Sequence, residues 1–247
     1  MTIKRFDPDA GLAEFVSATG GLASETPKTP ATLGASAVEA RLLELQDVLK
    51  NLPETTDHET RGALHVQMGD LLVELERGAE AWKLCRPAFD QFIAARDWEG
   101  AAHICDILYQ SDQPGSLSAL GQGIWLAVTF PMDPELTVNL LHHVVEDTPD
   151  DSDGAAVAAA TAVFLTDVRA GGEARDNLLF FANQILGTVA RRHDNIETEE
   201  QFQFWYERLE LDNPDQFLPR LRNVVDVLVQ DDWWLDREQI HAQLPVN

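Results

Sequence analysis

Apolar residues recur every three to four positions along most of the chain. Over residues 36–52 the apolar positions that share one stripe are Val38, Leu42, Leu45, Leu49 and Leu52. A period of 3.6 residues puts such positions on one face of an α-helix, whereas a strand alternates apolar and polar residues. Ser36 is suited to cap this helix and Pro53 to end it. The pattern therefore predicts a helix with one buried face.

The same period continues towards the C-terminus. It predicts helices over residues 56–77, 80–95, 98–110, 117–129, 134–147, 153–169, 173–192, 198–211, 214–230 and 235–243. Asp133-Pro134 and Asn213-Pro214 are suited to start helices, and Gly78 and Gly171-Gly172 to end them. No stretch alternates long enough to form a strand. We predict an all-α fold of stacked antiparallel helix pairs, either an α-solenoid or an irregular helical bundle.

The first 35 residues differ from the rest. They combine glycine, proline, serine and threonine and show no sustained period, which is typical of a flexible segment. We predict a flexible N-terminal arm over residues 1–35 and one helical-repeat domain over residues 36–247.

The corner between the helices at 80–95 and 98–110 contains only Arg96 and Asp97, so these two helices must run antiparallel. The segment ARDWEGAAHICDIL at residues 95–108 resembles the inter-helix corner of a tetratricopeptide-type repeat. Trp98 follows the turn and the small Ala101 comes three residues later. The resemblance covers residues 60–112, and no regular 34-residue period continues beyond it. It implies a tetratricopeptide-like α-solenoid whose grooved surface binds a protein or a peptide.

A formal net charge of -24 limits the partners. Nucleic acids and anionic lipids are held mainly by Lys and Arg, so we predict that the protein binds neither. The 72 residues from Asp97 to Val168 contain no Lys or Arg but twelve acidic residues. Either a halophilic source or GC-rich coding DNA would explain an acidic protein that is poor in lysine. The acidic stretch predicts a partner with a basic segment.

The N-terminal sequence lacks the apolar run of a signal peptide. The most apolar window, residues 154–166, is too short to cross a bilayer. We therefore expect a cytoplasmic protein without membrane insertion.

Three groups of residues are candidates for chemistry. His142, His143 and Glu146 have the spacing of metal ligands on one helix, or one histidine packs while the other is solvated. Glu99, His103 and Asp106 share a helix face that could orient an imidazole. Cys85 and Cys105 form a redox pair or act as small hydrophobic residues. No nucleotide, phosphate-loop or metalloprotease pattern occurs, so we predict no cofactor and no enzymatic activity.

The string Glu54-Thr55-Thr56-Asp57-His58 resembles the Glu-Pro-x-Asp-His motif of acidic, all-helical chaperones that bind twin-arginine leader peptides, but lacks its proline. Alternatively, Thr55 or Thr56 caps a helix whose first turn holds Asp57.

Aromatic residues gather near the C-terminus, in FQFWYERL at residues 202–209 and in Trp233-Trp234. No single helix face can bury the four rings of the first group, so they contact core on two sides or a partner.

The expected function is that of a non-enzymatic adaptor, assembly factor or chaperone. The predicted partner-binding residues are Trp82, Trp98, Trp125, Trp233, Trp234, Asp106 and Asp112. The alternatives are a metal or redox enzyme that uses His142, His143 and Glu146, and a structural subunit without a ligand.

Overall fold

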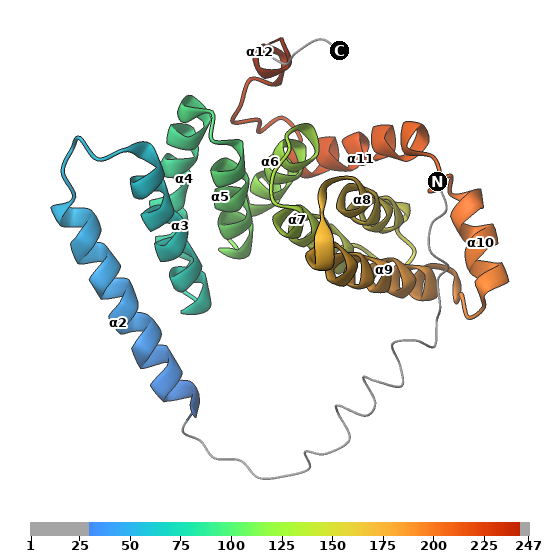
Figure 1. Cartoon of the computed structure of the whole chain (residues 1–247), viewed down its shortest axis with the longest axis horizontal. Helices are drawn as coiled ribbons and strands as arrows, with labels where there is room; N and C mark the ends of the chain where they lie inside the picture. The colour runs from blue at the N-terminus through green and yellow to red at the C-terminus, as the bar shows by residue number, and fades with distance from the viewer. Residues whose placement is uncertain (1–29, 243–247) are drawn as a thin grey trace. The chain divides into compact units, whose positions relative to one another are not determined.

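The computed structural model describes residues 30–242, which divide into two compact units. Unit 1 contains residues 137–222, and unit 2 contains residues 32–136 and 223–242. We describe each unit by itself. The described residues form eleven helices and no strand (Figure 1), so the predicted all-α fold is confirmed. The single domain over residues 36–247 stays a prediction, and most of the predicted N-terminal arm lies outside the described residues.

Unit 2 consists of helices packed in neighbouring pairs. Its helices are α2 (Pro30–Asn51), α3 (His58–Glu74), α4 (Gly78–Ala95), α5 (Trp98–Gln110), α6 (Ser116–Thr129), the second half of α11 (Pro214–Val229) and α12 (Arg237–His241). Helix α3 packs on both α4 and α5, which Figure 1 shows side by side, and α5 packs on α6. This stacking is compatible with a helical repeat.

Small residues allow these helices to approach closely. A Cβ atom added to Gly69 of α3 would lie 2.7 Å from Sγ of Cys85 and 2.9 Å from Cγ2 of Ile107, on the two neighbouring helices. Ala81 and Ala88 of α4 and Ala101 of α5 are buried as well. The small residues in the segment that resembles a tetratricopeptide repeat therefore lie at helix contacts.

The corner before α5 has the predicted position. Arg96 adopts the left-handed conformation (φ 59°), and the carboxylate of Asp97 accepts a hydrogen bond from the Gly100 N–H at 2.9 Å. This side chain satisfies one of the unpaired donors of the first turn. Helix α5 thus begins at Trp98, as predicted.

Several predicted helix boundaries differ from the structure, and three of the differences have a clear physical cause. Helix α2 begins at Pro30 rather than after Ser36, because proline is tolerated in the first turn of a helix. Asp57 caps α3, where Thr55 or Thr56 was expected: its side chain accepts from the Thr60 N–H at 2.7 Å.

Gly78 begins α4 instead of ending α3. A Cβ atom at this position would lie 2.0 Å from the carbonyl oxygen of Ser111, so a close backbone contact requires the glycine. The residue in left-handed conformation after α3 is Glu76 (φ 56°).

Unit 1 is built around a helix of small residues. Its helices are most of α7 (Pro134–Asp147), α8 (Asp153–Arg169), α9 (Gly172–Asp194), α10 (Glu199–Arg208) and the start of α11. Six alanines of α8 are at most 2 % exposed, and α8 packs on α9. Ser152 caps α8 through the Ala155 N–H, and Thr198 forms a capping box with Gln201 at the start of α10.

Within residues 30–242, none of the helices combines the length and the apolar character that a membrane span requires.

Candidate functional site

Aromatic contacts join the five tryptophans of unit 2 in two groups. The ring of Trp98 stacks on Phe130 with centroids 4.5 Å apart, and Trp125 meets Phe130 edge-on at 6.3 Å. Trp125 also lies edge-on to Trp233 at 6.4 Å. The neighbouring Trp234 lies edge-on to Trp82 at 6.0 Å. The two groups meet at the sequence neighbours Trp233 and Trp234. All five tryptophans are half-buried, and we call the two groups together the aromatic surface of unit 2.

Trp233 and Trp234 belong to a non-helical segment between α11 and α12, and two side chains of α6 hold its backbone. The hydroxyl of Ser118 donates to the carbonyl oxygen of Asp232 at 2.8 Å. The N–H of Trp234 donates to Oε1 of Gln122, also at 2.8 Å. Gln122 is completely buried, so these bonds satisfy polar groups that are hidden from water.

Arginines cover two of the indoles. The guanidinium carbon of Arg86 lies 4.1 Å from the ring centroid of Trp234, and that of Arg237 lies 3.8 Å from the ring centroid of Trp233. Both distances fall within the range of cation–π attraction. Arg86 also binds Asp90 at 3.0 Å, and Arg237 binds Asp226 at 3.0 Å.

The structure therefore places the five predicted tryptophans in two aromatic groups of unit 2, whereas the two predicted aspartates differ from each other. Asp106 is buried, and its carboxylate accepts a hydrogen bond from Gln110 at 2.9 Å. Asp112 is exposed and lies in a turn with φ 50°.

Sequence reasoning missed Ser118 and Gln122. Gln122 lies in the run LGQGIWLA, where it is the only polar side chain between apolar residues and glycines. A single amide on an otherwise apolar helix needs hydrogen-bond partners when it is buried. That requirement was the signal in the sequence. The hydrogen-bond partner of Gln122 is the N–H of Trp234, which lies 112 residues away in sequence.

The candidate metal ligands of α7 make ordinary protein contacts. The ring of His142 lies edge-on to Phe181 at 5.8 Å, and Nδ1 of His143 lies 3.6 Å from Oε2 of Glu146. Across residues 30–242, no three His, Cys, Asp or Glu side chains are grouped so that they could hold a metal ion.

The face formed by Glu99, His103 and Asp106 does not converge on one imidazole. Glu99 accepts a hydrogen bond from the Asp133 N–H at 3.2 Å. Nε2 of His103 lies 3.8 Å from Asp70 of α3. Desolvation raises the pKa of Asp70 and Asp106 adds to this rise, while His103 opposes it.

Both cysteines are free and buried. Desolvation raises the pKa of the Cys85 thiol to about 12, and it also raises the pKa of Cys105 strongly. Since the thiolate is the reactive form, neither side chain is prepared for redox chemistry near neutral pH.

The two residues of the Asp57-His58 pair have separate roles. Asp57 caps α3, and the ring of His58 lies edge-on to Phe92 at 4.9 Å, with Nε2 3.6 Å from Asp97. A helix cap therefore does lie in this string, but the capping residue is Asp57 rather than Thr55 or Thr56.

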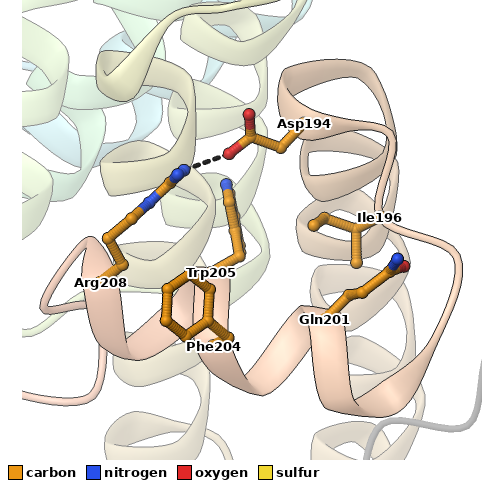
Figure 2. Close-up of a pocket in the computed structure, with 6 residues that line it drawn as sticks. All are labelled: Asp194, Ile196, Gln201, Phe204, Trp205 and Arg208. Atoms are coloured by element: carbon orange, nitrogen blue, oxygen red, sulfur yellow. Dashed lines mark hydrogen bonds and ion pairs between the residues drawn. The ribbon is translucent and has the colours of Figure 1, made fainter.

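Unit 1 contains a pocket of about 210 Å³ next to α10. Figure 2 shows its lining residues: Asp194, Ile196, Gln201, Phe204, Trp205 and Arg208. An ion pair joins Asp194 to Arg208. This volume is below the range of about 300–1,000 Å³ that small-molecule sites occupy, so the pocket is not a strong candidate for a substrate site.

A histidine of unit 1 has neighbours at both ring nitrogens. The indole N–H of Trp205 donates to Nδ1 of His193 at 3.3 Å, and Nε2 of His193 lies 3.1 Å from Asp153. Nδ1 also lies 3.5 Å from Asp194. These contacts orient the His193 ring.

The acidic stretch of the sequence is divided between the units. Asp97, Glu99 and Asp133 belong to unit 2, whereas the acidic residues from Glu146 to Asp167 belong to unit 1. In unit 1, Asp167 pairs with Arg175 and Asp153 pairs with Arg220.

Comparison of the chain with protein-family models, with curated proteins and with solved structures found no match.

Proposed function

We propose that the protein is a non-enzymatic adaptor, assembly factor or chaperone that binds a protein or peptide partner through the aromatic surface of unit 2. The observation that carries this proposal is that five of the six tryptophans lie in the two aromatic groups of unit 2 and that each is half-buried. Half-buried indoles offer large contact areas to a partner, and tryptophan is enriched among the residues that dominate interface energetics.

The helix packing of unit 2 supports the same proposal. Stacked helix pairs of the tetratricopeptide type present extended surfaces to peptides and proteins. Acidic residues of unit 2 outnumber its lysines and arginines by more than two to one. The resulting negative potential favours a partner that brings a basic segment and disfavours nucleic acids.

Affinity capture with two matched variants tests the proposal. Trp98→Ala removes a half-buried ring of the aromatic surface, whereas Phe204→Ala removes a ring of unit 1 that is 69 % exposed. Tagged wild-type chain is expected to capture the same partner reproducibly from cells of the source organism at low salt. Trp98→Ala should reduce that capture at least fivefold, and Phe204→Ala should leave it unchanged.

Circular dichroism must show that both variants keep their helices. Equal capture by both variants would contradict the proposed surface. Elemental analysis of untagged protein separates this proposal from the metal-enzyme alternative, because an adaptor needs no stoichiometric transition metal.

A further inference from the structure

The segment at residues 231–236 is bound to unit 2 in the manner of an extended peptide. It has no helix of its own, and two side chains of α6 contact its main chain: the Ser118 hydroxyl at the Asp232 carbonyl and Oε1 of Gln122 at the Trp234 N–H. Nε2 of Gln122 lies 3.5 Å from the Asp232 carbonyl oxygen as well. Contacts to main-chain groups do not depend on the side chains of the bound segment, so another extended segment could make them.

The Trp234 side chain is the anchor of this segment. Its ring lies edge-on to Trp82 at 6.0 Å and to Phe89 at 5.4 Å, and the Arg86 guanidinium lies over it. A Cβ atom at Gly115 would lie 2.9 Å from the Trp82 ring, so Trp82 packs tightly against the start of α6. The α4–α6 surface is our name for five side chains on two helices. They are Trp82, Arg86 and Phe89 on α4, and Ser118 and Gln122 on α6.

The segment is acidic, and so is the unit that holds it. Asp231, Asp232 and Asp236 lie within six residues, in a unit whose acidic residues already exceed its cations. The net negative charge of the unit disfavours an acidic segment at long range, whereas Arg86 and Arg237 lie over the two indoles. A segment with the same tryptophan and with lysines in place of Asp231 and Glu238 would keep the main-chain contacts, the anchor and the bond from the Trp234 indole N–H to Asp232 at 3.2 Å. Its charge would also complement that of the unit.

We infer that the α4–α6 surface is a binding site for an extended segment that carries a tryptophan flanked by basic residues, and that residues 231–236 occupy it as an intramolecular ligand. This inference rests on the proposed function and names the chemistry of the partner. The internal segment has the advantage of its tether, which gives it an effective concentration in the millimolar range. To displace the internal segment, a partner segment must bind more tightly than this effective concentration favours the internal one, and we expect its positive charge to supply the extra affinity.

Three synthetic peptides test the inference by fluorescence anisotropy. The first has the sequence of residues 229–242. The second carries Asp231→Lys and Glu238→Lys, which turn its net charge from negative to positive. The third adds Trp234→Ala to the second. The full chain is used as wild type and as Trp234→Ala, in which the internal segment lacks its anchor.

The basic peptide should bind the Trp234→Ala chain at least tenfold more tightly than the first peptide at low salt, and this ratio should fall as salt screens the charges. It should bind wild type at least tenfold more weakly than it binds Trp234→Ala, because the internal segment competes. The third peptide should show no saturable binding. Adding Gln122→Leu to the Trp234→Ala chain should weaken binding of the basic peptide at least tenfold.

A measurement on wild type covers the case in which Trp234→Ala does not fold. With the basic peptide in millimolar excess, the Trp234 amide should exchange its hydrogen at least threefold faster, because its bond to Gln122 is released. Unchanged exchange, or no saturable binding to a Trp234→Ala chain that keeps its helices, would overturn the inference. If the peptide binds but no cellular partner depends on Trp98, the proposed function fails alone. If a partner depends on Trp98 and the peptide does not bind, the inference fails alone.

Discussion

The two units use tryptophan in opposite ways. The one tryptophan of unit 1, Trp205, is 1 % exposed, and its N–H donates to His193. The five tryptophans of unit 2 remain half-buried, and their neighbours are other aromatic rings and arginines. A ring that is fully buried with a satisfied N–H stabilises a core, whereas linked rings that keep part of their area exposed can still lose water to a partner. The environment of each tryptophan thus indicates its role better than its presence in the sequence does.

The units also differ in how they accommodate the acidic residues of the stretch without lysine and arginine. In unit 1, Asp153 and Asp167 each have an arginine partner from a later helix. In unit 2, Asp97 has His58 as a neighbour at 3.6 Å, and a histidine is charged only when protonated. Outside this stretch, aspartates of unit 2 pair with arginines as well. The stretch is therefore compensated in unit 1 by arginines that follow it in sequence.

The largest effect is expected from the buried ring of unit 1. Trp205→Ala should lower the free energy of unfolding by about 3–5 kcal/mol, because it leaves a cavity and removes the partner of His193. Phe204→Ala, on the same helix α10, should change it by no more than about 0.5 kcal/mol, since that ring is 69 % exposed. Chemical denaturation followed by circular dichroism measures both values. Similar costs for the two variants would refute the distinction between core and surface rings in unit 1.

A smaller effect should come from the close helix packing of unit 2. A Cβ atom on Gly121 would lie 2.4 Å from Cγ2 of Val229, so Gly121→Ala should cost about 1–3 kcal/mol through overpacking. The control is Gly171→Ala in unit 1, where nothing lies within 4 Å of the added atom, and its cost should stay near zero. Tryptophan fluorescence during denaturation reports mainly on unit 2. A neutral Gly121→Ala variant would show that this contact can relax.

Helix capping provides a third test. Thr198→Ala in unit 1 removes the capping box of α10 and should cost about 1 kcal/mol. Ser36 lies inside α2 of unit 2 and is not its cap, so Ser36→Ala should cause no loss, because alanine favours the helix interior. A loss for Ser36→Ala as large as that for Thr198→Ala would show that α2 begins where the sequence pattern predicted.

The last test concerns the pH dependence of stability, which should show no effect at neutral pH and a loss only in alkaline solution. Burial and the nearby Asp212 raise the pKa of Tyr206 in unit 1 to about 12, from an ordinary value of 10.0. The unfolded chain therefore releases this proton first, so stability should fall as the pH rises from about 10 to about 12. Tyr206→Phe should remove this part of the pH dependence, measured by denaturation at several pH values. The same alkaline loss in both proteins would exclude Tyr206 as its source.

Periodicity and local capping allowed most helices to be predicted from the sequence. Helices α5, α7 and α8 have the predicted bounds, because Asp97, Asp133-Pro134 and Ser152 act within one turn of each helix start. Helix α3 was predicted less well. The residue that adopts the left-handed conformation after it is Glu76, and glutamate carries no sequence signature for that conformation.

The candidate site could be predicted only in part. Tryptophan was recognisable as an anchor, but the pairing of Trp82 with Trp234 joins residues that are far apart in sequence. The role of Gln122 depends on the same long-range arrangement. Periodicity describes which face of a helix is apolar, and it contains no information on which distant segment covers that face.

Unit 2 is encoded in two stretches, because residues 137–222 of unit 1 separate residues 32–136 from residues 223–242. During synthesis, helices α3 to α6 therefore leave the ribosome well before the segment that satisfies Gln122 exists. For that interval the nascent chain exposes Trp82 and an unpaired amide, and only the last part of translation covers them. The order of synthesis thus makes completion of unit 2 a late event.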